Sequence, residues 1–442
     1  MRFAPRHSRI KLQVIQLAAL IFFTVSGGPY GLEPLLSYAG KHGAILILFI
    51  IAVFWALPIT LSILELNGMM PLIGGYYQWI KRSLGMRWAF YVGWWSQLNA
   101  FIDLAIYPKL LVEYAAFVIP SITQYKIPIY LLVIWLNAVL NIRGIALVGR
   151  ITVILGVLLI TPFLILFGIA VFHNGATMGF PYLSFRGEGL SSLGMATYFV
   201  IWNFIGWDDI TTYANEVERP SRTYLLAICI SFCCIFGINL LAIWVAIDSG
   251  IDLSFFSNQG FPVLGLQIGS RWLGVLIAAA GIFSSLGLFA SVLLSISRVP
   301  KAIADDGIFP SKFTVLHPKY NTPYISIIVC ALFVSCLSLW TLTDLIIVDV
   351  ILSGAKITLE LVALIKLRRS HPREHRPFKI PLGIGGLTIL AFSPLLILSV
   401  AIVSLASSIP RMKGALLWAI LLLLSADIAW RIRRYSPGRG GI

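Results

Sequence analysis

The feature that most constrains this chain is a run of glycines with a proline in the middle of its first long apolar segment. The run reads Ser26-Gly27-Gly28-Pro29-Tyr30-Gly31-Leu32-Glu33. Glycine tolerates non-helical dihedral angles, whereas proline lacks the backbone N–H and clashes with the preceding turn. Inside a bilayer, irregular backbone is tolerated only where protein or a water-filled cavity surrounds it. We therefore predict two half-helices joined by an unwound hinge, an arrangement that favours binding of a polar solute.

The composition indicates a membrane protein. The 442 residues are 59% hydrophobic and only 12% charged, with a mean hydropathy of +0.91. Soluble proteins carry roughly 25% charged residues. We therefore expect a polytopic protein surrounded by the lipid bilayer. The net charge of +15 does not indicate nucleic acid as a partner, because the basic residues fall in short loops between apolar runs.

Apolar runs of about 20 residues predict twelve transmembrane helices. Of the 33 Lys and Arg residues, 25 lie in loops on one side of this arrangement, six on the other and two, Lys109 and Lys356, within spans. Basic loops favour the cytoplasm, so we expect both termini on the cytoplasmic side of the cell membrane. The runs are centred on Phe22, Trp55, Asn99, Ile134, Leu159, Asn203, Ile235, Phe289, Val329, Gly354, Leu395 and Leu421.

The sixth apolar run is interrupted near its middle, as the first one is. Asn203 and Gly206 stand there among apolar and aromatic residues, followed by Asp208 and Asp209. Runs one and six are five apart, so two five-helix repeats of inverted topology would make the two broken helices partners around one central site. The sequence predicts an all-α membrane protein in a single transporter domain, residues 1–442, with repeat one at about 10–172, repeat two at about 190–370 and two peripheral helices at about 382–434.

Several segments resemble signatures of the amino acid–polyamine–organocation superfamily. They are Ser26–Glu33, Gly74-Gly75-Tyr76 preceded by Glu65, and Asn215–Thr223. Within this superfamily the chain is most similar to the polyamine-uptake and L-type amino acid transporter branch, on the residues Ser26–Glu33, Asp103–Pro108, Gly206–Asp208 and His375–Leu382. The resemblance implies a LeuT-type 5+5 inverted repeat with broken helices 1 and 6. It also implies a polyamine or amino acid substrate held between helices one, three, six, eight and ten.

Two departures from the superfamily pattern bear on the substrate and the coupling ion. In its amino acid carriers, amides of the first hinge hold the substrate carboxylate, and here Pro29 removes one amide donor. The half-helix N-terminus still favours an anion, so amino acids remain an alternative. Some members carry a lysine in helix five where sodium binds in relatives. The span Ile151–Phe172 contains no lysine, so that proton mechanism does not transfer to this chain.

Charged residues inside spans are costly and usually functional. Asp103 lies deep in the third run and is predicted to bind substrate or carry a proton, with a structural pairing, for example to Lys109, as the alternative. Glu33 follows the first hinge and could bind an amine, gate the outer side or be an exposed helix-end residue. Asp208 could bind a substrate ammonium or cap a second half-helix, and Asp209 could do the capping instead.

Other charged residues are predicted to have structural or gating roles. Lys109 and Glu113, and likewise Lys356 and Glu360, are four residues apart and would share one helix face. Glu65 is expected to be a structural or gate residue on the cytoplasmic side.

Aromatic residues surround both hinges, and their faces attract ammonium groups by about 2 kcal/mol when desolvated, although they also pack apolar side chains. They are Tyr30, Tyr107, Trp202, Phe204 and Trp207. Ser284 and Ser285 in the eighth run are predicted to be either sodium ligands or small helix-packing residues.

These observations predict a secondary active transporter that imports small organic cations, polyamines first and amino acids as the alternative, by alternating access. Proton coupling through Asp103 or Glu33 is favoured over Na+ coupling. A channel is disfavoured because no filter-like loop repeats. An enzyme, cofactor or bound metal is not expected because no nucleophile–base pair or metal triad lies in the spans. The predicted substrate-binding residues are Ser26, Gly27, Gly28, Pro29, Tyr30, Gly31, Glu33, Asp103, Tyr107, Trp202, Asn203, Phe204, Gly206, Trp207 and Asp208. The predicted coupling and gating residues are Asp103, Glu33, Glu65 and Lys356.

Overall fold

The computed structural model describes residues 11–174, 189–256, 260–406 and 410–435. Over these ranges the chain consists of helices and connecting loops, with only two isolated β-bridges, Leu12 to Val217 and Ile73 to Tyr213. The all-helical class that the sequence predicted is confirmed.

The helices follow the apolar runs closely. Each predicted centre lies within a helix, within the π turn Ala52–Ala56 that joins α2 to α3, or, for Asn203, directly after α8. The helices are α1 Val14–Val25, α2 Glu33–Ile51, α3 Leu57–Met69, α4 Tyr76–Leu84, α5 Met86–Val118, α6 Lys126–Ile142, α7 Ile145–Asn174, α8 Leu190–Trp202, α9 Pro220–Asp248, α11 Pro262–Ile296, α12 Val299–Asp305, α13 Tyr324–Leu337, α14 Leu342–Ser370, α15 Ile384–Ala406 and α16 Pro410–Tyr435.

Seven stretches of the described chain are helical, long and apolar enough to cross a membrane. Two further helices, α1 and α13, are apolar but shorter. The long helices α5 and α14 are not among the seven, and both carry charged residues in their interiors, Asp103 and Lys109 in α5 and Asp349 and Lys356 in α14. The seven stretches are 33–69, 120–142, 145–172, 220–248, 262–305, 384–404 and 414–432. The chain is therefore a multi-pass membrane protein.

The first apolar run is broken where the glycines predicted it. Helix α1 ends at Val25 and α2 begins at Glu33. Between them Gly27, Gly28 and Gly31 have φ values of +61°, +89° and +85°, which side chains with a Cβ rarely adopt. A second break follows within α2 at Gly40, where φ is 61°.

The sixth run is also broken, but the continuation differs from the prediction. Helix α8 ends at Trp202, and after Gly206 (φ +94°) the chain forms two short 3-10 turns, Asp209–Thr212 and Ala214–Glu216, in place of a second α-helical half. The side chain of Asp208 makes no capping hydrogen bond. The predicted capping role of Asp208 is therefore wrong, since its carboxylate turns toward α14 and pairs there.

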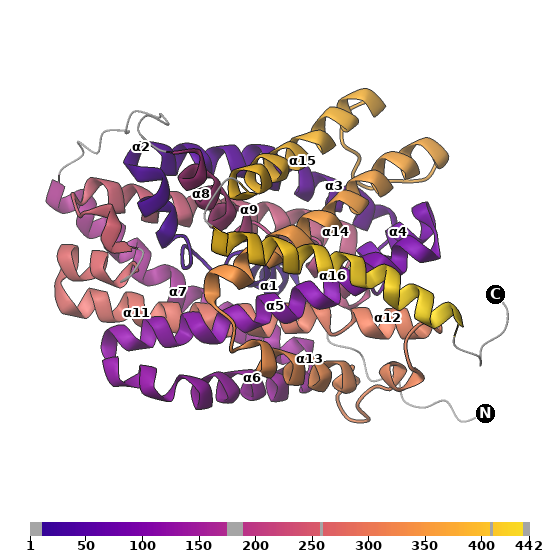
Figure 1. The fold of residues 1–442 in the computed structure, drawn as a ribbon, viewed down its shortest axis with the longest axis horizontal. Helices are drawn as coiled ribbons and strands as arrows, with labels where there is room; N and C mark the ends of the chain where they lie inside the picture. Colours follow the sequence, from indigo (N-terminus) through magenta and orange to yellow (C-terminus); the bar gives the residue numbers. More distant parts are fainter. Residues whose placement is uncertain (1–10, 175–188, 257–259, 407–409, 436–442) are drawn as a thin grey trace.

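The two breaks meet at the centre of the bundle. Helix α1 lies in the middle, with α15 along one edge and the packed pair α6 and α13 along the opposite edge (Figure 1). A Cβ on Gly206 would lie 2.6 Å from the carbonyl oxygen of Thr24 at the end of α1. Only a glycine therefore lets the second hinge pass this close to the first.

One end of the bundle carries basic residues on and beside α4, α5 and α12, and it is called the basic end below. They include Lys81, Arg82, Arg87, Arg298 and Lys301. Here Lys81 of α4 pairs with Asp306 after α12 at 2.6 Å, and the Gly74 N–H donates to the Thr212 carbonyl at 2.9 Å. Near this end, Leu12 also exchanges two 3.0 Å backbone hydrogen bonds with Glu216 and Glu218. These backbone contacts join the residues that precede α1 and α4 to the segment that follows α8.

Candidate functional site

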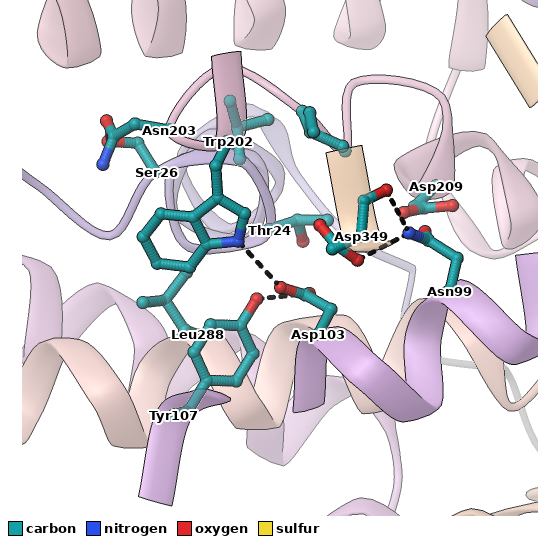
Figure 2. Close-up of a pocket in the computed structure, with 13 residues that line it drawn as sticks. Thr24, Ser26, Asn99, Asp103, Tyr107, Trp202, Asn203, Asp209, Leu288 and Asp349 are labelled. Atoms are coloured by element: carbon teal, nitrogen blue, oxygen red, sulfur yellow. Dashed lines mark hydrogen bonds between the residues drawn. The ribbon is translucent and has the colours of Figure 1, made fainter. Parts of the chain in front are cut away.

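A small polar cavity lies where the two hinges face α5, α11 and α14 (Figure 2). It has about 20 Å³ of free space, roughly enough for one water molecule. Six predicted site residues line it: Ser26, Asp103, Tyr107, Trp202, Asn203 and Gly206. Seven lining residues were not in the predicted site: Thr24, Val25, Asn99, Ile205, Asp209, Leu288 and Asp349. A substrate larger than water therefore requires the cavity to widen.

Asp103 stands at the centre of this lining. The hydroxyl of Tyr107, one helical turn along α5, donates to one carboxylate oxygen, and the indole N–H of Trp202 donates to the other at 3.3 Å (Figure 2). The predicted alternative of a pairing with Lys109 is not what the structure has, because the Lys109 ammonium donates to the Ser338 carbonyl at 2.5 Å. Asp103 thus joins α5 to the second hinge and faces the cavity.

A second carboxylate, that of Asp349 of α14, lines the cavity. The amide nitrogen of Asn99 donates to its Oδ1 at 2.5 Å and to its backbone carbonyl at 3.0 Å. Asp349 was not among the predicted site residues. The rule that singled out Asp103, an acid within an apolar run, also applies to Asp349, which lies seven residues before Lys356 and thus on the same helix face.

The third carboxylate of the lining, Asp209, belongs to a buried ion cluster. The ammonium of Lys356 is fully buried and lies 2.9 Å from Oδ1 of Asp209 and 2.7 Å from Oδ2 of Asp208. Lys356 was predicted to share a helix face with Glu360 and does lie on α14 with it, but its ion pairs are with the segment after the second hinge. Asp208 was predicted to bind substrate, but its side chain is fully buried against Lys356 and lies outside the cavity lining.

The charges around the cavity do not balance. Among the described residues of this cluster, five carboxyl groups, four of them buried and that of Asp103 half-buried, accompany a single ammonium, that of Lys356. The five are Asp103, Asp208, Asp209, Asp349 and Glu360. An excess of buried acids in a low-dielectric region favours a bound cation or protonation. The arrangement is therefore suited to hold a cation or to bind protons.

Polar side chains tie the two hinges together. The Ser26 hydroxyl donates to Oδ1 of Asn203 at 2.6 Å, and the Asn203 amide donates to the carbonyls of Gly28 and Tyr30 at 3.3 and 3.4 Å. Ser284 of α11 donates to the carbonyl of Gly27 at 2.5 Å. These hydrogen bonds couple the position of one hinge to that of the other and to α11.

Glu33 lies behind the cavity wall. Its carboxylate accepts the Gly31 N–H at 2.6 Å and the Tyr114 hydroxyl at 2.8 Å, and only 4% of the residue is exposed. It is therefore neither an exposed helix-end residue nor part of the lining. Gly31 in turn lies beneath the Trp202 ring, which a Cβ would meet at 2.5 Å.

Three predicted aromatic contacts lie outside the lining. The Tyr30 hydroxyl donates to the carbonyl of Ile277 at 2.5 Å, Trp207 packs on Phe232, and Phe204 is completely buried. These three side chains pack in the protein core around the hinges. The remaining predicted residues, Gly27, Gly28 and Pro29, contribute the backbone of the first hinge.

Glu65 lies in a separate ion cluster between α3, the end of α14 and the loop that follows. Its carboxylate accepts from Arg368 at 2.5 Å, from the Ile380 N–H at 2.9 Å, and pairs with Arg376 at 3.2 Å. All three side chains are buried. This cluster fastens α14 to α3 away from the cavity.

We expect Glu65→Gln to destabilise the fold. Removing the charge leaves two buried guanidinium groups without their counter-ion, which costs about 3–5 kcal/mol. The measurement is the thermal unfolding of the purified protein in detergent. The matched control is Glu374→Gln, whose surface pair with Arg82 is partly exposed and is worth about 0–1 kcal/mol. Equal unfolding temperatures for the two variants would contradict a structural role for the Glu65 cluster.

Known proteins resemble the chain over most of its length. The sequence family described as "Amino acid permease" matches residues 12–424. Polyamine transporter RMV1 of Arabidopsis thaliana is 31% identical, over 90% of this chain and 83% of that protein. Polyamine transporter PUT1 of Oryza sativa subsp. japonica is 30% identical, over 88% and 73%. Branched-chain amino acid permease BcaP of Bacillus subtilis (strain 168) is 27% identical, over 75% of each.

These relatives are transporters, not enzymes, and the resemblance drawn from the hinge and loop signatures is confirmed. The chain belongs to the amino acid permease family, within the amino acid–polyamine–organocation superfamily of membrane transporters.

Proposed function

We propose that this protein is a secondary active transporter that imports polyamines across the cytoplasmic membrane by alternating access. The observation that carries the proposal is the cavity between the hinges, where Asp103, Asp209 and Asp349 converge from three different parts of the fold. Relatives named as polyamine transporters, at 30 and 31% identity, support the same substrate class.

A polyamine fits the chemistry of this lining. Its ammonium groups are separated by short apolar chains, and the three carboxylates come from α5, from the segment after α8 and from α14. Tyr107 and Trp202 line the same cavity and hold Asp103. Their ring faces would attract an ammonium group by about 2 kcal/mol once water is excluded.

The first hinge has lost two of the donors that a substrate carboxylate would use. Pro29 has no N–H, and the Gly31 N–H is already bound by the carboxylate of Glu33. The N-terminus of α2 favours an anion, and Glu33 supplies that anion from within the protein. Amino acid transport remains the second candidate, because BcaP, a relative at 27% identity, is named as an amino acid permease.

For the architecture we propose the 5+5 inverted repeat of twelve spans, with repeat one at about 10–172, repeat two at about 190–370 and peripheral helices at about 382–434. The basic end faces the cytoplasm in this proposal, together with both termini, because short basic loops stay on that side. Opening toward the cytoplasm would part Gly74 from Thr212 and Leu12 from Glu216. The Glu65 cluster would hold the end of α14 while these contacts change.

We further propose proton coupling, with Asp103 as the carrier. Its carboxylate faces the cavity, whereas the carboxylate of Glu33 is engaged by Gly31 and Tyr114. A buried carboxylate beside a cation site can release its proton when the substrate binds. Sodium is the less favoured coupling ion. Uptake by Asp103→Asn that still responds fully to a pH gradient would remove Asp103 from this role.

The test of the proposed function is uptake of labelled putrescine and spermidine into proteoliposomes, with and without an inward proton gradient. We expect uptake that depends on the gradient and that arginine, leucine and alanine do not compete. Accumulation of amino acids alone would establish the second candidate. Fast equilibration down a concentration gradient, with no accumulation under either condition, would indicate a channel.

We expect Glu33→Ala to admit amino acids. The substitution removes the carboxylate from the start of α2 and leaves the Gly31 N–H only its longer, 3.2 Å contact with the Tyr114 hydroxyl. A substrate carboxylate can then take the place of the lost side chain. An anion at a helix N-terminus gains about 1 kcal/mol, so competition by arginine should strengthen about five- to tenfold. The measurement is inhibition of labelled spermidine uptake by arginine. Glu113→Ala, which removes an exposed acid of α5, is the control and should leave arginine without effect.

A further inference from the structure

The fully buried Lys356 ammonium occupies what is itself an ammonium-binding site. Two carboxylates hold it, Asp208 at 2.7 Å and Asp209 at 2.9 Å, and it lies 5.1 Å from the centre of the Tyr76 ring. Carboxylates and an aromatic face are the groups that bind alkylammonium ions. The transporter thus carries, on α14, the same functional group that its proposed substrate carries at each end.

The Lys356 site and the cavity share a wall. Asp209 binds the Lys356 ammonium and also lines the cavity. Asp349, which lines the cavity too, lies two helical turns before Lys356 on the same helix, and Asp103 faces both from α5. A substrate ammonium that enters the cavity therefore approaches a carboxylate that Lys356 already neutralises.

The excess of carboxylates over ammonium groups at the cavity gives Lys356 a role in the step in which the empty transporter changes conformation. A bound polyamine neutralises the acids of the cavity while the loaded transporter changes conformation. The empty transporter has no such cation, and moving several uncompensated carboxylates within the membrane interior is costly. A tethered ammonium lowers that cost in every empty cycle, because it cannot be lost to either side.

We propose that Lys356 is a built-in counter-ion that lets the empty transporter return, and that a substrate ammonium competes with it for Asp209. This inference rests on the proposed function and adds the step that distinguishes net uptake from exchange. With Lys356 present the empty transporter reorients and net uptake proceeds. Without it, only the loaded form changes conformation, so the protein exchanges one polyamine for another.

The experiment compares two assays of labelled spermidine uptake, into empty proteoliposomes for net uptake and into proteoliposomes preloaded with unlabelled spermidine for exchange. Lys356→Met should lower the ratio of net uptake to exchange at least about tenfold relative to the wild type, since only the empty step loses its counter-ion. Lys356→Arg keeps the charge and should retain both activities. Lys109→Met removes a second lysine that is buried among the described residues and lies outside this cluster, and it should change both activities in parallel.

Loss of exchange together with net uptake in a folded Lys356→Met variant, or retention of both, would overturn the inference. If that variant does not fold, the wild-type protein provides the test through its own rates of net uptake and exchange. The inference requires net uptake into empty proteoliposomes at a rate comparable to exchange, and a wild type that only exchanges contradicts it. Absence of spermidine exchange in the wild type is a different result, because it overturns the proposed function itself.

Discussion

Replacing Asp103 by Asn should lower spermidine uptake by about 30-fold or more. In the proposed function its carboxylate pairs with a substrate ammonium, and removing one partner of such a desolvated charge pair costs at least about 2 kcal/mol. The asparagine side chain keeps the shape and the acceptor oxygen for Tyr107 or Trp202, so the loss reflects charge and not packing. The measurement is the initial rate of labelled spermidine uptake, normalised to the amount of folded protein in the membrane.

The matched control for this experiment is Asp427→Asn. Asp427 lies on α16, is partly exposed and pairs with Arg87 and Arg431, well away from the lining of the cavity. Its removal should change uptake by no more than about twofold, in line with the small worth of exposed pairs. Equal uptake by the two variants would mean that Asp103 does not hold the substrate.

Gly206→Ala should abolish transport. The residue has φ +94°, which alanine adopts only at a cost of about 1–2 kcal/mol, and the new Cβ would lie 2.6 Å from the Thr24 carbonyl oxygen. That neighbour is backbone and cannot rotate away, so the two hinges must separate. The expected result is a folded protein that no longer takes up spermidine.

The control for the hinge variant is Gly237→Ala within α9. A Cβ there meets no atom within 4 Å, and alanine favours a helix over glycine by about 1 kcal/mol. Uptake by Gly237→Ala should equal that of the wild type. Normal uptake by Gly206→Ala would show that the close approach of the two hinges is not needed for transport.

The hinges were predictable from the sequence because their cause is local. Three glycines and a proline within Gly27–Gly31 exclude a continuous helix whatever surrounds them. Asp103 was predictable for a similar reason, since an acid in an apolar span needs a special environment. Each of these inferences uses only the residue and its immediate neighbours in the chain.

The partners of the charged residues were not predictable, because they are set by tertiary packing. Helical spacing predicted only that Lys356 shares a helix face with Glu360. Its ammonium binds Asp209, which is 147 residues away in the sequence. The capping role suggested for Asp208 depended on an α-helix after Gly206, where the chain forms 3-10 turns. Once that helix is absent, Asp208 is free to pair with α14.

Asp349 represents a different limit. The residue lies within an apolar run, as Asp103 does, but the predicted residues of its helix were only Lys356 and Glu360. Its importance emerges from Asn99, 250 residues away, which positions its carboxylate at the cavity. A complete list of acids within spans would have included Asp349, and only the fold distinguishes it from an acid at a helix end.

The most direct test of the account is the competition of putrescine and ornithine for uptake of labelled spermidine into proteoliposomes. Ornithine is putrescine with one added carboxylate, so the two compounds share their amine spacing and differ in the group that the account excludes. Asp103, Asp209 and Asp349 line the cavity, and the carboxylate of Glu33 is bound at the first hinge. Putrescine should therefore compete strongly, and ornithine at least about 30-fold more weakly. This factor is the effect of one uncompensated buried charge, the carboxylate of ornithine. Equal competition by ornithine would contradict the account, because the first hinge would then be binding a substrate carboxylate.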